Sequence, residues 1–180
     1  MTFTLRPVEP AADAALIHSW VSQERAYFWG MTEKSCDEVR DIYAYLDSLE
    51  THHAYLVHDD DAPVAIFQTY QPEHDPVGEC YAVQEGDLGV HLFIAAGERR
   101  PGFTASLTTY LLGVVFADPA VRRVVGEPDV RNQKSRRRAE LVGFEPGPVI
   151  DLGHKRAQLS FLQRPQEVSP RGAPPESPGR

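Results

Sequence analysis

The chemistry that stands out in the sequence lies in a polar, basic turn at residues 97–102, GERRPG. An apolar stretch precedes this turn and a helical pattern at 103–116 follows it. A turn directly before a helix exposes unpaired backbone N–H groups at the positive end of the helix dipole, which favours a bound anion. Gly102 lets the backbone approach such a ligand closely, and Arg99 and Arg100 add positive charge. The segment therefore suits a pyrophosphate, although an ordinary strand–turn–helix connection has the same pattern.

A second basic segment lies further along a chain that is otherwise acidic. The 180 residues carry a formal net charge of −8 at pH 7. This balance argues against a nucleic-acid partner, because phosphate neutralisation requires a surface rich in lysine and arginine. One compact run of basic residues is the exception: Arg131, Lys134, Arg136, Arg137 and Arg138. A local patch of this kind favours a small anionic ligand over a polynucleotide.

The elements that must position these groups follow from hydrophobic periodicity. Strands are expected at residues 2–7, 53–58, 63–70, 86–96, 121–125, 144–152 and 157–162. Helices are expected at 11–21, 35–49, 103–116 and 133–142. Ser35 and Glu38 have the spacing of a capping box at the start of the second helix. This order favours an α/β (α+β) fold in which a mixed central sheet carries helices on both faces.

The composition, 42% hydrophobic and 24% charged, fits one globular domain. From Pro165 onward the chain is rich in Pro, Ser and Gly, so we predict a domain at 1–164 and a disordered tail at 165–180. Cys36 and Cys80 have no metal-ligand spacing, and we expect no metal. The N-terminus lacks a signal pattern and no apolar stretch is long enough to span a membrane, which predicts a cytoplasmic protein.

A second unit follows the basic turn: a short strand, an acidic–Pro–Asp turn, an Asn that opens a helix, and a Gly–Phe that closes it. The two units together resemble the core of the GNAT acyltransferases. The chain is most similar to their siderophore-biosynthesis branch, which includes aerobactin-type N-hydroxylysine acetyltransferases, mycobactin lysine N-acyltransferases and desferrioxamine-type hydroxycadaverine acyltransferases. The resemblance is carried by residues 18–20 (HSW), 28–29 (FW), 70–72 (YQP), 86–91 (GDLGVH), 102–104 (GFT), 118–119 (DP), 122–125 (RRVV), 127–132 (EPDVRN), 143–144 (GF) and 159–161 (LSF).

The resemblance implies an acyl-CoA cosubstrate, acetyl-CoA or succinyl-CoA, held where the sheet splays open. The residues then expected to contact it are Leu92, Ile94, Arg99, Arg100, Gly102, Phe103, Thr104, Asn132 and Arg136. Asn132 equally suits a helix cap, and Arg136 a solvated helix face. The sequence departs from the general pattern in two places. The turn reads Gly-Phe-Thr, not Gly-x-Gly or Gly-x-Ala, and Ala139 stands where many members carry a tyrosine acid.

N-acylation requires a neutral amine, and a simple alkyl amine with a pKa of about 10.4 is protonated at neutral pH. A base must therefore remove a proton, whereas a less basic hydroxylamine depends more on positioning. The resemblance implies that His91 is this base and that Asp129 is its partner, fixing the tautomer and raising the basicity of the imidazole. From the residues alone, a core histidine and a Pro–Asp turn remain open.

Phe28, Trp29, Gly30 and Met31 are consecutive and cannot all face one side of a helix or strand, so some are expected to line an acceptor site. Such walls suit the aliphatic stem of a lysine or diamine. The candidate substrate-binding residues are Phe28, Trp29, Met31, Gln68, Tyr70 and Asp87. Asp87 is a candidate anchor for a distant ammonium group, with an ordinary role in a turn as the alternative.

The sequence thus predicts an enzyme that transfers an acyl group from coenzyme A to the terminal amine or hydroxylamine of a lysine-, ornithine- or cadaverine-type precursor of a hydroxamate siderophore. Two alternatives remain: a GNAT enzyme acting on another small amine, such as an antibiotic or polyamine, and a non-catalytic acyl-CoA-binding module. The expected partners are these small molecules, with no nucleic acid or membrane, and a monomer is favoured.

Overall fold

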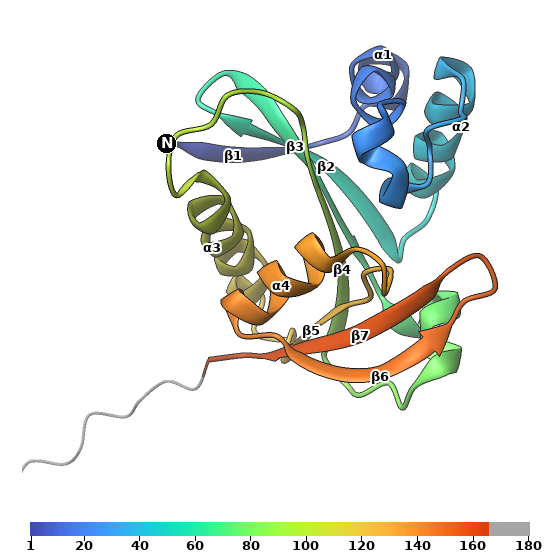
Figure 1. Cartoon of the computed structure of the whole chain (residues 1–180), viewed down its shortest axis with the longest axis vertical. Coiled ribbons are helices and arrows are strands. Elements are labelled where there is room, and N and C mark those ends of the chain that lie inside the picture. Colours follow the sequence, from blue (N-terminus) through green and yellow to red (C-terminus); the bar gives the residue numbers. More distant parts are fainter. Residues whose placement is uncertain (166–180) are drawn as a thin grey trace, which may run out of the picture.

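The computed structural model describes residues 1–165, which form one seven-stranded sheet and four α-helices (Figure 1). The strands are β1 (Phe3–Pro7), β2 (His52–Asp59), β3 (Ala62–Tyr70), β4 (Asp87–Ile94), β5 (Arg123–Gly126), β6 (Glu145–Asp151) and β7 (Arg156–Gln163). The helices are α1 (Pro10–Val21), α2 (Cys36–Asp47), α3 (Phe103–Ala117) and α4 (Gln133–Val142). The strand order is β1-β2-β3-β4-β5-β7-β6, and β4 and β5 run parallel while the other pairs of neighbours are antiparallel.

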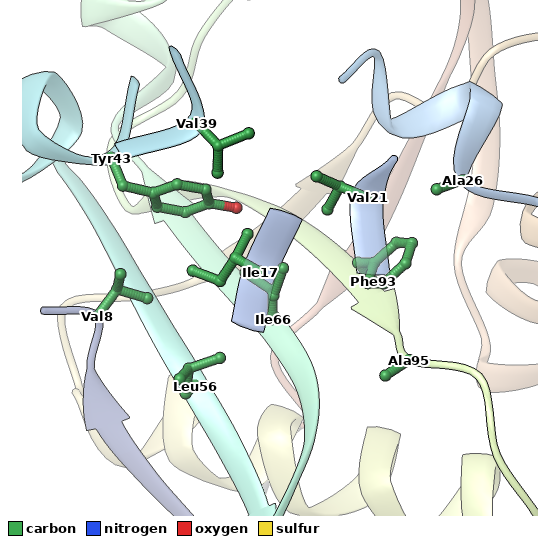
Figure 2. Packing of buried hydrophobic residues seen from close by; sticks show 10 residues of the cluster. All are labelled: Val8, Ile17, Val21, Ala26, Val39, Tyr43, Leu56, Ile66, Phe93 and Ala95. Atoms are coloured by element: carbon green, nitrogen blue, oxygen red, sulfur yellow. The ribbon is translucent and has the colours of Figure 1, made fainter. Parts of the chain in front are cut away.

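Helices cover both faces of the sheet because side chains along a strand alternate between the two faces. On one face, Ile17 of α1 and Tyr43 of α2 pack with Leu56, Ile66 and Phe93 of the central strands (Figure 2). The opposite face carries α3, whose buried residues join a second cluster that includes Val57 and Phe67. The predicted mixed sheet with helices on both faces is confirmed.

Local signals also predicted where elements begin. The Ser35 side chain accepts a hydrogen bond from the Glu38 N–H at 3.2 Å, and the Glu38 carboxylate accepts from the Ser35 N–H at 2.8 Å. The predicted capping box at the start of α2 is therefore present. Periodicity did not identify the short 3₁₀ helices at Glu24–Trp29, Pro72–His74 and Pro76–Cys80, because such pieces span too few residues to show a repeat.

The predicted tail at 165–180 lies outside the described residues except for Pro165. None of the helices in the described part of the chain has both the length and the apolar character needed to cross a bilayer.

The β4–β5 pair opens along its length. Its register pairs Asp87 with Arg123, Leu88 with Val124 and Gly89 with Val125, and β4 continues to Ile94 without a β5 partner. We call the paired start of β4 and β5 the closed end, and the region where they diverge, after Gly89, the open end. The predicted splay of the sheet is thus confirmed, and the free edge of β4 leads towards the turn before α3.

Candidate active site

A histidine–carboxylate pair bridges the two strands at the open end. His91 lies on β4, two residues before Phe93 and therefore on the face that carries α1 and α2. Glu127 follows the last residue of β5 directly. The His91 Nε2 and a Glu127 carboxylate oxygen are 2.5 Å apart. The imidazole is 36% exposed while the carboxylate is 2% exposed, so the pair presents its base to solvent and keeps its acid buried.

Three donors surround the buried carboxylate of Glu127. Besides His91, the Tyr70 hydroxyl donates to it at 2.8 Å and the Lys155 ammonium donates at 3.3 Å. Burial by itself would raise the pKa of Glu127, but the neighbouring His91 and Lys155 charges and the Tyr70 hydroxyl lower it below its ordinary value. Glu127 is therefore an anion that stabilises positive charge on the imidazole.

The Glu127 contact determines how His91 can act. With Nε2–H donating to the carboxylate, Nδ1 remains as the nitrogen that accepts a proton. The Gln68 amide lies 3.3 Å from Nδ1. Rotation of this amide presents its NH2 group to a neutral Nδ1 or its oxygen to a protonated one, so Gln68 suits both states of the base.

Gly89 allows this arrangement. A Cβ built at Gly89 would lie 2.0 Å from the Tyr70 ring, so only glycine lets the tyrosine cross β4 and reach Glu127. The Tyr70 ring lies between those of His52 and His91, with centroid separations of 5.8 and 5.1 Å. The second glycine of GDLGVH thereby places one of the hydrogen-bond donors to the candidate acid.

Asp129, predicted to be the partner of His91, makes other contacts. Its carboxylate accepts two hydrogen bonds from the Arg131 guanidinium, at 2.9 and 2.7 Å, and these bonds lower its pKa to about 2. The pairing predicted with His91 is therefore wrong, and Glu127 occupies that position. The chain turns after Pro128, where the Asn132 N–H donates to the Asp129 carbonyl oxygen. Within this turn, the Asp129 carboxylate also accepts from the Arg131 backbone N–H. The first acid of EPDVRN, directly after a buried strand, was the signal for the correct residue.

The turn before α3 matches several features expected of an anion site. Gly102 is the N-cap in the left-handed region, with a φ of 80°, and no side chain caps the helix. A Cβ at Gly102 would meet no atom within 4 Å, so the approach to the first helical turn at Thr104 is open. The Arg99 guanidinium lies over the Phe103 ring, 5.0 Å from its centroid, and Arg100 lies 3.8 Å from an Asp59 oxygen.

Other residues predicted to contact acyl-CoA have additional contacts within the fold. Phe103 is buried in the α3 cluster, so only its backbone is accessible to a ligand. Leu92 and Ile94 also pack in that cluster with their side chains, while their backbones lie on the free edge of β4. Asn132 caps α4 by accepting from the Ser135 N–H, and Arg136 donates to the Val130 carbonyl oxygen.

Among the predicted aromatic residues, Trp29 packs edge-on to His91 with a centroid separation of 6.3 Å. Phe28 is exposed beneath the Arg131 guanidinium, and Met31 packs against the core cluster on the α1 side. Trp29 also packs against this cluster, and it is the one of the three that contacts the candidate base.

Asp87 lies at the closed end and contacts no open surface. Arg123 donates two hydrogen bonds to its buried carboxylate, at 2.6 and 2.7 Å, and the Tyr81 hydroxyl donates a third at 3.0 Å. The hypothesis that Asp87 anchors a substrate ammonium is wrong, because its oxygens are already occupied by a buried cation.

A cavity of about 300 Å³ lies beside His91. Gln68 and Tyr70, both predicted substrate-binding residues, line it together with His91. Sequence patterns did not predict its remaining lining residues, which come from α2 and the segment after it, the start of β2, the end of β3 and the loop that follows: Tyr45, Leu46, Leu49, His52, His53, Thr69, His74, Asp75 and Pro76. Within residues 1–165, no group of three His, Cys, Asp or Glu side chains is arranged to hold a metal ion.

A family model described as an acetyltransferase (GNAT) domain matches residues 9–152. The N(6)-hydroxylysine O-acetyltransferase of Escherichia coli is 29% identical over 170 residues, which cover 89% of this chain and 52% of that protein. This chain therefore spans about half the length of that relative. The lysine N-acyltransferase MbtK of Mycobacterium sp. (strain MCS) is 29% identical over 180 residues, covering 98% of this chain and 73% of the relative.

Among solved structures, AAC(6')-Ib in complex with paromomycin and acetyl-CoA superposes with a TM-score of 0.79 at 22% identity. The superposition covers 91% of this chain and 94% of that protein. At this identity, the likeness shows a shared fold.

Proposed function

Because the chain belongs to the acetyltransferase (GNAT) domain family, we propose that it transfers an acyl group from acyl-CoA to a terminal amine or hydroxylamine. The acceptor we propose is a lysine-, ornithine- or cadaverine-type precursor of a hydroxamate siderophore, in line with the names of the two relatives. The observation that carries the proposal is the His91–Glu127 pair at the open end, where a partly exposed base is hydrogen-bonded to a buried anion.

The cosubstrate is proposed to enter along the open end. The free edge of β4 from Val90 to Leu92 offers backbone groups that the pantetheine arm can bind in place of a strand, while the Ile94 carbonyl oxygen accepts from Arg25. The first turn of α3 at Gly102 offers N–H groups to the pyrophosphate, and Arg99 and Arg100 lie beside it. Acetyl-CoA and succinyl-CoA are both proposed as donors.

The proposed reaction uses His91 as a general base. The acceptor nitrogen attacks the thioester carbonyl carbon while its proton passes to His91 Nδ1, and the ionised Glu127 stabilises the imidazolium that forms. The C–S bond then breaks, and the imidazolium proton passes to the departing thiolate to give free coenzyme A and the amide or hydroxamate. Ala139 supplies no acid for the thiolate, which leaves His91 as the residue that returns the proton.

The test is free-thiol release from acetyl-CoA and succinyl-CoA with N6-hydroxylysine, N5-hydroxyornithine, N-hydroxycadaverine and lysine. We expect release with at least one hydroxylated acceptor, and a kcat/KM that falls about 10²- to 10⁴-fold in His91→Ala, the usual contribution of general acid–base catalysis. Coenzyme A affinity should remain unchanged in this variant.

His154→Ala is the matched control, because His154 is exposed in the β6–β7 turn and bonds only the Leu152 carbonyl oxygen of that turn. Binding of coenzyme A without thiol release from any of these acceptors would refute the proposed function. Full activity of His91→Ala would refute the role of the base.

A further inference from the structure

The cavity beside His91 extends along a row of aromatic rings that ends at a carboxylate. The rings of His91, Tyr70 and His52 follow one another, with centroid separations of 5.1 and 5.8 Å. Beyond them, the His52 Nε2 lies 3.5 Å from the Asp75 Oδ2. Apolar side chains from the C-terminal half of α2, including Leu46, also line this space. The rings of Tyr70 and His52 thus lie between the candidate base and this carboxylate.

Asp75 has one carboxylate oxygen with spare hydrogen-bonding capacity. Its Oδ1 caps the 3₁₀ helix at Pro76–Cys80 by accepting from the Val77 N–H at 2.9 Å. Its Oδ2 has only the long contact with His52, and the side chain remains 24% exposed. A primary ammonium donates three hydrogen bonds and is a stronger partner for a carboxylate than this contact.

The lining contains one carboxylate and four histidines, His52, His53, His74 and His91. Among the twelve residues that line the cavity, Asp75 is the acid, and neither lysine nor arginine is present. An α-carboxylate placed next to Asp75 would be repelled, with no guanidinium or ammonium in the lining to compensate it. The His52 imidazole already faces the Asp75 carboxylate.

From this cavity we infer that the acceptor is a diamine-type compound, and that Asp75 holds its distal ammonium. The reacting amine or hydroxylamine lies at His91, the methylene chain packs along the Tyr70 and His52 rings and Leu46, and the far end carries an ammonium without a neighbouring carboxylate. The inference rests on the proposed acyl transfer at His91 and narrows its acceptor from amino acids and diamines to diamines. Asp75 is a specificity-determining residue in this account.

Two acceptors that differ only in the carboxylate test the inference: N-hydroxycadaverine and N6-hydroxylysine. We expect kcat/KM to be at least about 10-fold higher for N-hydroxycadaverine, because the like-charge contact between an α-carboxylate and Asp75 is avoided. N-hydroxypentylamine, which lacks the ammonium, measures the contribution of the distal charge by itself.

Asp75→Asn is the informative variant, because asparagine keeps an oxygen that can cap the 3₁₀ helix while removing the charge. KM for N-hydroxycadaverine should rise about 10- to 100-fold with kcat nearly unchanged, the range of a hydrogen bond to a charged group. KM for N-hydroxypentylamine should stay the same, which shows that the variant is folded. Asp47→Asn is the control for a nearby loss of negative charge, since Asp47 lies at the end of α2 and does not line this cavity.

Equal or better use of N6-hydroxylysine by the parent protein would overturn the inference and leave the proposed acyl transfer intact. If Asp75→Asn kept the parent's preference for N-hydroxycadaverine over N6-hydroxylysine, the inference would also be overturned. Thiol release with none of the three acceptors would refute the proposed function together with this inference, so the two failures are distinguishable.

Discussion

The closed and open ends of the β4–β5 pair each contain a buried carboxylate, and the two differ in the cation that faces them. At the closed end, Asp87 is held by the two-pronged guanidinium of Arg123, directly across the paired strands. At the open end, Glu127 faces His91 across strands that no longer pair. Both carboxylates are almost fully buried, so burial does not distinguish a structural acid from a candidate catalytic one.

The difference lies in whether the partner can change its charge. Arginine keeps its proton in proteins, so the Asp87–Arg123 pair holds one state and fastens the start of the two strands. Histidine gains and loses a proton near neutral pH, and His91 is partly open to solvent. A strand pair that is closed at one end by a permanent ion pair can stay open at the other end and still position a base.

The largest effect is expected from breaking the closed end. Asp87→Asn leaves a buried guanidinium without a carboxylate, and we expect the free energy of unfolding to fall by about 3–5 kcal/mol. Urea denaturation at neutral pH measures this loss. At temperatures where the variant is folded, its KM for the acceptor should match that of the parent. A large rise in KM without loss of stability would restore Asp87 as a substrate anchor.

The same pair makes a prediction about pH. Burial by itself would raise the pKa of Asp87, but the bonds from Arg123 outweigh it and the pKa is lowered. A depressed folded-state pKa gives stability that is present above the unfolded value and is lost as pH falls through the folded value. The stability difference between the parent and Asp87→Asn should therefore narrow at acid pH, and a constant difference would contradict the assignment.

At the open end, Glu127→Gln keeps the shape of the side chain and removes its charge. We expect kcat/KM to fall about 100-fold, because the imidazolium loses its buried counter-ion. The pH at which activity rises should also move to lower values, which a purely structural defect would not cause. The loss of kcat/KM should be larger for lysine than for a hydroxylamine acceptor, because the protonated amine of lysine depends more on a base. Equal losses of kcat/KM for the two kinds of acceptor, together with an unchanged pH profile, would argue against a catalytic role for the His91–Glu127 pair.

The smallest effect is expected from Asp129→Asn, two residues further along the same turn. Its partner Arg131 is well exposed, and exposed pairs contribute little. We expect kcat/KM to change less than about threefold, the effect of a weak surface interaction. Glu127→Gln measured in parallel is the control. A loss as large as that of Glu127→Gln would place Asp129 back in the catalytic group.

The sequence by itself determined the order of elements, the capping box at Ser35 and Glu38, and the site of the histidine on β4. These features depend on short-range periodicity and spacing, so they can be read along the chain. The glycine at position 89 was part of a recognised motif, but its reason, the close approach of the Tyr70 ring, became clear only in three dimensions.

Only the tertiary structure decided which acid faces His91 and which acid lies at the far end of the cavity. Glu127 and Asp129 are separated by one residue in the sequence, yet Glu127 faces His91 while Asp129 faces Arg131. Asp75 joins the cavity through contacts between the start of β2 and the loop after β3, while Asp87, the earlier candidate, is occupied by Arg123. The physical reason is that side-chain pairing depends on distances across neighbouring strands, which spacing along one strand does not contain.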